Sequence, residues 1–495
     1  MNNIVSSINT IESYKWIRAI ALLAALIHFI VVIFIVVSRI NYRYELEWVE
    51  GASLIQVYRI YTGQSLYTQP SLQYIPMIYP PLFFYLAAII AKFTGISFLP
   101  LRLVSFASTI GSLLIIYFIV KQKTRSALIG LIAAGSFVAV FRLGGAWFDI
   151  ARVDMLFIFL SLVGVYFLVK QETKYAVFAG ILFALALLTK QTGLPVFVFI
   201  VVATFILFRK QTVPLLGGFV IPTLLTFFYL NASTGGWYKY FIYTVPTSFL
   251  LRWSSLQNIL QISFQAELLI IIIGFSPLVF GFQEAIHDKE HLFYYFGSMG
   301  FIAASILARL GHEAYDNNIL PAYAGLAILF GIGIEWMTSH FYFKIVSRNL
   351  FQSMVWLVVI AQFIWLRYDP IRQIPTQNDR QAGDALVSEI KAASGEVLIP
   401  YHNYLALYAG KKVYFHFVAL DGIRSLRTNT RPELKEILNQ FHSTSFRLFI
   451  MDLPDNLIQI NHCADTQSIN YESADTFYPV TGYSVRPTIR YEDCP

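Results

Sequence analysis

Long apolar stretches recur from residue 17 to residue 366, and they constrain the fold of this chain more than any other feature. A bilayer core about 30 Å thick needs roughly 20 apolar residues per helix. Only 13% of the residues are charged, whereas soluble domains carry about 25%. The chain is therefore predicted to be an α-helical polytopic membrane protein. About eleven transmembrane helices are expected, near 17–38, 100–120, 127–146, 154–169, 175–189, 194–208, 212–230, 266–282, 291–308, 318–337 and 350–366.

Basic residues in short loops indicate which face is cytoplasmic. Three such clusters, at 121–125, 209–210 and 344–348, lie on one side only if the apolar tract 79–95 does not cross. That tract is expected to be an interfacial helix on the outer face. We therefore predict a multi-pass protein of the plasma (inner) membrane with a cytoplasmic N-terminus. Its long outer loops would span about 39–99 and 231–265.

The composition becomes that of a soluble domain from about Asp369. Residues 1–368 are thus expected to form the transmembrane domain and 369–495 a small extracytoplasmic α/β domain. Short strands are predicted at 397–399 and 447–451, and helices at 379–392 and 432–441. The chain's two cysteines, Cys463 and Cys494, both fall in this region. They would form a disulfide on an oxidising face, and two free thiols are the alternative.

Three carboxylates, Glu45, Glu47 and Glu50, follow the first predicted helix. Carboxylates beside a membrane interface are costly to bury, so they indicate a function. Glu47 and Glu50 are three residues apart and would share one face of a helix. A carboxylate there could deprotonate an acceptor hydroxyl. The alternative is a solvated turn next to the membrane.

A second acidic pair, Asp149 and Asp154, follows the third predicted helix and is expected on the same face as Glu50. Asp154 opens an apolar run, where the helix dipole favours an anion. The alternative role for Asp154 is that of a helix cap. Arg152, between the two, would pair with one of these carboxylates or with a phosphate.

Two further outer segments carry polar groups suited to an anion or a sugar. Lys190 lies between the hydroxyls of Thr189 and Thr192, and it suits a phosphate oxygen. A lysine that extends to the interface is the alternative. The segment 309–318 offers Arg309, His312 and Asn317, although it also reads as a polar hairpin.

His287 and His291, four residues apart, form a possible metal pair. Their loop is expected on the cytoplasmic side, away from the other polar groups. We interpret it as a solvated loop.

These features together resemble the polytopic GT-C glycosyltransferases, which include protein O-mannosyltransferases and the lipid A aminoarabinose transferase. The resemblance covers roughly residues 15–340 and depends on the order of several short motifs. These are Glu50-Gly51, Gly63, Leu66-Tyr67, Tyr79-Pro80-Pro81-Leu82, Leu101-Arg102-Leu103, Thr189-Lys190 and the loop from Gly311 to Asn317 before Pro321.

The resemblance implies a sugar transferase that uses a polyprenyl-phosphate donor outside the membrane. A hexosyl or pentosyl group would pass to a cell-envelope lipid, glycan or protein by inverting direct displacement. Many members have Asp-Glu where this chain has Val49-Glu50, so the resemblance implies Glu50 as the base and leaves Glu47 as a substitute. Asp154 resembles the family's second-loop acid.

The resemblance also implies the groups that hold the donor. Lys190, Arg309 and His312 would stabilise the departing phosphate. Arg152, Asn317 and Tyr79 complete the predicted donor- and substrate-binding set, and Asp149 completes the acidic set. Some members of the family use a divalent metal and others do not, so a metal stays open.

Membrane lipids are expected partners, and no nucleic-acid-binding signature accompanies the net charge of +7. The alternative function is a transporter or flippase of lipid-linked sugars without covalent chemistry. A transporter should have paired halves or broken helices at the midplane. The sequence has neither pattern, and its polar residues gather at one predicted face. A structural membrane protein would leave the acidic pairs unexplained.

Overall fold

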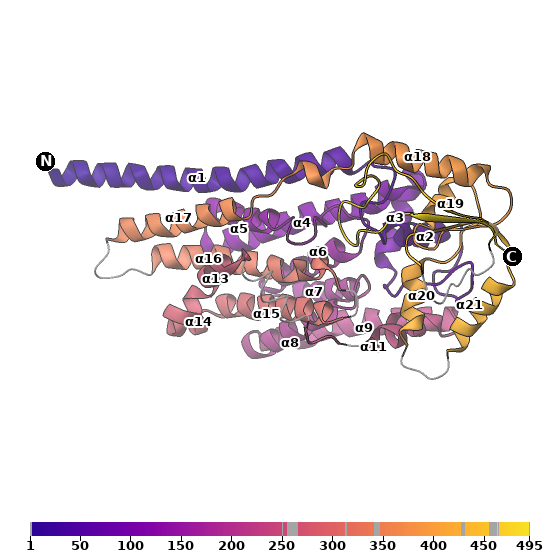
Figure 1. Cartoon of the computed structure of the whole chain (residues 1–495). Coiled ribbons are helices and arrows are strands. Elements are labelled where there is room, and N and C mark those ends of the chain that lie inside the picture. The colour runs from indigo at the N-terminus through magenta and orange to yellow at the C-terminus, as the bar shows by residue number, and fades with distance from the viewer. Residues whose placement is uncertain are drawn as a thin grey trace.

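The computed structural model describes residues 2–249, 251–254, 266–311, 314–340, 347–426, 431–454, 463 and 465–494. Figure 1 shows a bundle of long helices with a smaller mixed domain at one end, and the two termini lie at opposite ends of the molecule. The main helices of the bundle are α1 (Asn2–Arg39), α4 (Phe98–Thr124), α5 (Ala127–Ala139), α6 (Asp154–Leu168), α7 (Thr173–Leu187), α8 (Gly193–Leu207), α9 (Arg209–Ser233), α13 (Leu268–Phe280), α15 (Lys289–Arg309), α16 (Leu320–Ser339) and α17 (Arg348–Trp365).

Each predicted transmembrane segment coincides with one of these helices, so the α-helical polytopic architecture is confirmed. Several of the helices are shorter than a full crossing requires, and the number of crossings stays a prediction. Five of the described helices are long and apolar enough to cross a membrane, at Lys15–Arg39, Phe98–Thr124, Arg209–Ser233, Lys289–Arg309 and Asp316–Ser339.

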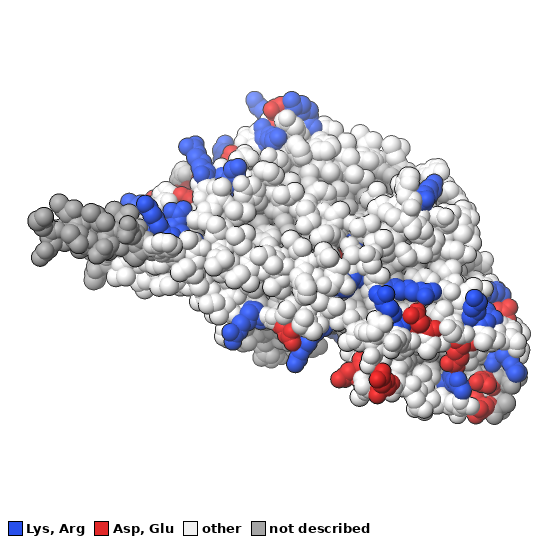
Figure 2. Space-filling view, turned by 90° about the horizontal axis from the view of Figure 1, so that it is seen from above, with Lys and Arg blue, Asp and Glu red and all other residues white. Residues whose placement is uncertain are grey.

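Burial distinguishes the centre of the bundle from its lipid-facing surface. The apolar window of Asp316–Ser339 is 94% buried, whereas that of Arg209–Ser233 is 17% buried although both are apolar. An apolar helix that is buried all round belongs to the core, and one that exposes apolar side chains faces lipid. Figure 2 shows a broad surface with few charged side chains between the charged groups near the N-terminal end and those of the C-terminal end.

Short helices form the end of the bundle that meets the C-terminal domain. α2 (Glu50–Tyr61) follows the acidic cluster, and the predicted interfacial tract forms α3 (Leu82–Thr94). The short elements α10 (Trp237–Lys239), η1 (Tyr240–Thr244) and α11 (Val245–Thr247) follow α9. Further along, η3 (Asp316–Ile319) precedes α16, whereas α14 (Phe282–His287) precedes α15 at the opposite end of the bundle (Figure 1). Of these elements, η3 carries Asn317 toward the acidic loops.

The C-terminal domain contains a four-stranded sheet with helices packed around it. Its strands are β1 (Val397–Leu398), β2 (Phe446–Met451), β3 (Asp465–Ser468) and β4 (Ile489–Cys494). The strand order is β1-β2-β4-β3, with β1 parallel to β2 and the other pairs antiparallel. The helices are η4 (Ile371–Gln373), α18 (Gln377–Ala392), α19 (Tyr404–Tyr408), α20 (Phe417–Arg424) and α21 (Pro432–His442).

This arrangement confirms the predicted small α/β region. A capping box between Thr376 and Asp379 starts α18, as expected for a helix that begins after a polar turn. The pairing of Cys463 with Cys494 is also confirmed, because a disulfide joins the start of the β3 segment to the end of β4. The alternative of two free thiols is wrong.

Candidate active site

A pocket lies between the end of the bundle and the C-terminal domain. Residues from five separate parts of the bundle line it, chiefly Glu47, Trp48, Tyr79, Trp147, Arg152, Phe249, Tyr315, Asn317 and Asn318. The C-terminal domain contributes the facing wall, which includes Val418, Ala419, Asp421, Gly422, Ser425, Gly482 and Tyr483. Glu47, Tyr79, Arg152 and Asn317 are therefore brought together as the sequence predicted.

Glu47 is the carboxylate that the bundle presents to this pocket. Arg152 Nη1 donates to Glu47 Oε2 at 2.7 Å, and Arg152 Nη2 donates to the hydroxyl of Tyr79 at 2.9 Å. Burial raises the pKa of Glu47, and the neighbouring Arg152 only partly offsets that rise. The site thus holds a carboxylate that is more basic than usual beside a guanidinium.

Glu50 lies in a different environment, although it is only three residues away. Arg102 Nε donates to Glu50 Oε1 at 3.1 Å, and Arg102 Nη2 donates to Glu50 Oε2 at 2.6 Å. The backbone amides of Leu46 and Ala151 donate to the same two oxygens at 2.7 and 2.6 Å. Both partners of the ion pair are fully buried. Glu50 therefore ties the loop after α1 to the loop between α5 and α6, and it does not line the pocket.

Arg102 is a site residue to which the sequence reasoning assigned no role. Its remaining donors reach the backbone carbonyls of Tyr42 and Tyr44, at 2.6 and 2.7 Å. A buried guanidinium is stable only when its charge is paired and its donors are used. An arginine near the start of the long apolar stretch at 100–120 was the signal that such a partner had to exist.

Asp149 is likewise part of a buried ion pair, with Arg39 at the end of α1. Arg39 also donates to the carbonyl oxygens of Gln373 and Ala146. Neither Asp149 nor Arg39 lines the pocket, and together they connect α1, the loop between α5 and α6, and the start of the C-terminal domain.

A buried hydrogen-bond network lies behind the residues that line the pocket. Asp154 Oδ1 accepts from Lys190 Nζ at 2.6 Å and from Asn317 Nδ2 at 3.1 Å. Asp154 Oδ2 accepts from Trp147 Nε1 at 2.9 Å, and Lys190 Nζ also reaches Asn318 Oδ1 at 3.0 Å. Lys190 is buried and ion-paired, so the alternative of a lysine that extends to the interface is wrong.

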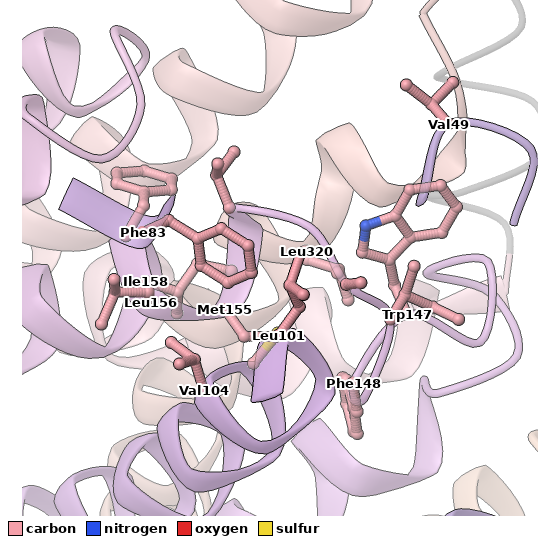
Figure 3. Packing of buried hydrophobic residues seen from close by; sticks show 14 of the residues in the cluster. Val49, Phe83, Leu101, Val104, Trp147, Phe148, Met155, Leu156, Ile158 and Leu320 are labelled. Atoms are coloured by element: carbon pink, nitrogen blue, oxygen red, sulfur yellow. The ribbon is translucent and has the colours of Figure 1, made fainter. Parts of the chain in front are cut away.

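This network reaches the pocket through the groups that it holds. Asp154 and Lys190 do not line the pocket themselves, whereas Trp147, Asn317 and Asn318 do. Figure 3 shows the Trp147 indole in the buried cluster between Val49 and Phe148. The geometry gives Asp154 and Lys190 the role of fixing these lining side chains.

Arg309 belongs to the same end of the bundle but lies outside the pocket lining. It donates to the carbonyl oxygen of Ala314 at 2.9 Å and pairs with Asp316 at 3.3 Å. His312 lies outside the described residues.

His291, from the discounted histidine pair, lines a separate cavity with Lys123 and Asp288. Among the described residues, no group of three or more His, Cys, Asp and Glu is arranged to hold a metal ion.

A chain of buried ionisable groups holds the C-terminal domain against the loop after α1. His402 Nδ1 lies 2.5 Å from Glu45 Oε2, and His402 Nε2 lies 2.8 Å from Asp452 Oδ2. The indole of Trp48 donates to the carbonyl of Tyr401 at 3.1 Å beside this chain. The loop that carries Glu47 is therefore fixed from both sides.

Solved structures superpose on this fold over most of the chain. ArnT from Cupriavidus metallidurans bound to undecaprenyl phosphate superposes with a TM-score of 0.59 at 10% identity, covering 95% of this chain and 97% of that chain. Its apo state gives 0.58 at 10% identity, covering 97% and 98%. The chain has the GT-C fold. An oligosaccharyltransferase from Archaeoglobus fulgidus in the apo form shares this fold with a TM-score of 0.50 at 10% identity, covering 88% of this chain and 69% of that chain.

The GT-C fold predicted from the sequence is thus confirmed, and the proteins with which it is shared are glycosyltransferases. The dolichyl-phosphate-mannose-protein mannosyltransferase family matches residues 79–237, which is less than half of the chain. This span includes Tyr79, Arg152, Asp154 and Lys190 but neither Glu47 nor Glu50. No curated protein matches the chain significantly.

Proposed function

We propose that this protein is a glycosyltransferase that moves a sugar from a polyprenyl-phosphate donor to an acceptor bound in the pocket. The observation that carries the proposal is the buried pair of Glu47 and Arg152, which lines a pocket at one end of a GT-C fold. One ArnT structure with the same fold is bound to undecaprenyl phosphate, which supports a lipid-phosphate donor. The acceptor is a cell-envelope lipid, glycan or protein.

Transfer proceeds by a single displacement with inversion. The acceptor oxygen attacks the anomeric carbon while the bond from that carbon to the phosphate oxygen breaks. The electron pair of that bond leaves with the polyprenyl phosphate, and Glu47 takes the proton of the acceptor hydroxyl. We assign the base to Glu47 because it lines the pocket, whereas the oxygens of Glu50 are taken by Arg102 and two backbone amides.

Arg152 is suited to stabilise the departing phosphate. Among the residues that the structure describes, it is the cation that lines the pocket. A phosphate beside Arg152 would compete with Glu47 for the same guanidinium donors. Donor binding would therefore make Glu47 a stronger base at the moment when a base is needed. Lys190 supports the site through Asp154 and Asn318, and roles for Arg309 and His312 stay predictions.

The reaction is proposed for the outer face of the plasma (inner) membrane, with the N-terminus in the cytoplasm. The disulfide in the C-terminal domain supports this orientation, because disulfides persist on oxidising faces. The basic clusters at 121–125 and 209–210 support a cytoplasmic position for the opposite end.

The test uses the full chain in lipid nanodiscs with synthetic undecaprenyl-phosphate hexoses and pentoses and extracted envelope lipids and glycans. Release of undecaprenyl phosphate is followed by mass spectrometry. Glu47→Gln should lower the rate about 10²–10⁴-fold, because an amide keeps the shape but cannot accept the proton. The matched control is Glu436→Gln, at an exposed position on α21. This variant should cleave the donor at the wild-type rate.

Glu50→Gln separates the two candidate bases. It should reduce the amount of folded protein, because Arg102 would keep its charge in a buried site without a counter-ion, at a cost of about 3–5 kcal/mol. A folded and inactive Glu50→Gln beside an active Glu47→Gln would move the base to Glu50. If the wild-type protein moves the lipid-linked sugars from one leaflet of a vesicle membrane to the other without cleaving any of them, the chain is a flippase and the proposal is wrong.

A further inference from the structure

We infer that Asp421, on α20 of the C-terminal domain, binds the acceptor in the wall of the pocket that faces Glu47, and that the bound part of the acceptor is a neutral sugar. This inference rests on the proposed function, since it divides one pocket between two substrates. Among the residues that the structure describes, Glu47 and Asp421 are the carboxylates that line the pocket, and they come from different domains.

The two walls differ in charge, because the bundle wall is neutral overall and the facing wall is negative. The wall from the bundle contains Arg152 next to Glu47, so its carboxylate is neutralised. The wall from the C-terminal domain contains Asp421 and, among its described lining residues, no lysine or arginine. A phosphate would be attracted to Arg152 and repelled by Asp421. The donor phosphate therefore belongs at the bundle wall, and the facing wall is left for the acceptor.

The carboxylate of Asp421 is available to a ligand. Its charged partner among the described residues is Arg424, whose Nε lies 4.0 Å from Asp421 Oδ1. A charge-assisted hydrogen bond spans about 2.7–2.9 Å, so this pair leaves the carboxylate oxygens largely unused. The side chain of Asp421 is 17% exposed, and that exposure opens into the pocket. Asp421 thus differs from Glu50 and Asp149, whose oxygens are used by the protein.

The position of Asp421 relative to Glu47 is fixed by the contacts between the domains. The chain Glu45–His402–Asp452 is buried, and Glu47 forms a β-bridge with Thr481 next to Gly482. α20 itself begins with a capping contact in which His416 Nδ1 accepts from the amide of Val418 at 3.2 Å. Glu47 and Asp421 are therefore held on facing walls of one pocket. Asp421 could bind the acceptor there while Glu47 acts as the base.

The remaining lining groups favour a neutral polyhydroxylated ligand. Tyr483 is 41% exposed, and its ring lies 6.2 Å from that of Tyr315. Aromatic rings pack against the C–H faces of a pyranose, while carboxylate and hydroxyl oxygens exchange hydrogen bonds with its hydroxyls. Ser425 adds a hydroxyl one turn after Asp421. A few placed polar groups among apolar ones are typical of a small-ligand site.

The test measures binding without turnover. Saturation-transfer NMR on the full chain in nanodiscs would use methyl hexopyranosides as neutral probes, with glucosamine as a cationic probe. Undecaprenyl phosphate binding is measured in parallel by isothermal titration. Asp421→Asn should weaken methyl glycoside binding about tenfold, since a hydrogen bond to a charged acceptor is lost. Its affinity for undecaprenyl phosphate should stay unchanged.

The control is Asp475→Asn, an exposed aspartate of the same domain, which should bind all probes as the wild type does. Equal weakening of glycoside and undecaprenyl phosphate by Asp421→Asn, or no weakening of either, would overturn the inference. Binding of glucosamine without methyl glycosides would overturn the assignment of a neutral sugar. Because these measurements need no cleavage of the donor, they can succeed or fail independently of the Glu47→Gln experiment.

Discussion

At the scale of single residues, two glutamates on one loop have opposite roles because their neighbours differ. Glu50 meets a guanidinium and two amides from distant segments, so its charge is used to hold loops together. Glu47 meets one guanidinium at the wall of a pocket and keeps an elevated pKa through burial. The predicted shared helix face is wrong, because α2 begins at Glu50 and Glu47 forms a β-bridge with Thr481 before it. Only the contacts distinguish a connector from a proposed base.

Gly482 provides a residue-scale test, because it lets the C-terminal domain approach Glu47. Its φ is +83°, and a Cβ there would lie 2.9 Å from Glu47 Cγ. Gly482→Ala should therefore lower transfer at least tenfold by displacing Glu47, in addition to a backbone cost of about 1 kcal/mol. Rates of donor cleavage and unfolding temperatures of the purified variant provide the measurement.

Gly410 is the matched control, since its φ is +69° and a Cβ would meet nothing within 4 Å. Gly410→Ala should lose stability to the same extent and keep its activity. Equal activity of the two variants would show that the contact between Gly482 and Glu47 has no effect on catalysis.

At the scale of elements, the loop after α1 and the C-terminal domain are joined by a buried imidazole between two carboxylates. Burial by itself would lower the pKa of His402, but Asp452 and Glu45 raise it to about 10. The same loop also contacts the domain through Tyr44, whose hydroxyl lies 2.5 Å from Asp384 Oδ1. The loop that carries Glu47 is therefore held by several contacts with the domain.

The raised pKa of His402 predicts how stability depends on pH. The folded protein keeps a proton on His402, whereas the unfolded chain releases that proton above the ordinary histidine pKa of 6.5. The contribution is complete below about pH 6.5 and should be lost as the pH rises toward 10. The unfolding temperature of the wild type should therefore fall across this interval more steeply than that of His402→Gln. His442→Gln, at an exposed position on α21, should keep the wild-type slope. Parallel slopes for the wild type and His402→Gln would contradict the prediction.

At the scale of the whole molecule, the candidate site and the basic loops lie at opposite ends of the bundle. The loop after α4 contains Lys123, which pairs with Asp288 at the start of α15. The pocket lies at the other end, beside the C-terminal domain (Figure 1). A membrane around the bundle would thus separate the site from these loops.

Labelling of single cysteines tests the orientation. The two native cysteines are joined in a disulfide and should not react. A cysteine at the exposed position Ser254 should react with an impermeant maleimide in intact cells, and one at Gln122 only after the membrane is opened. The reverse pattern would place the site in the cytoplasm and contradict the proposed outer-face reaction.

The sequence by itself determined the helices of the bundle, the division into a membrane part and an α/β part, and the loops that meet at the site. Apolar periodicity and composition report the burial of each segment, and they need no knowledge of its neighbours. The helix α2 and the strands β3 and β4 were not predicted. β3 is short and its residues are exposed, so it has no apolar pattern of its own.

Only the tertiary structure decided which buried charges pair. Glu50 meets Arg102 from 52 residues away, Asp154 meets Asn317 from 163, and Glu45 meets His402 from 357. A local pattern shows that a buried charge needs a partner, but the choice of partner depends on how the helices pack. The same packing brought Asp421 opposite Glu47. Asp421 could not be found from the sequence, because a single carboxylate in a soluble-looking segment gives no sign of the pocket that it faces.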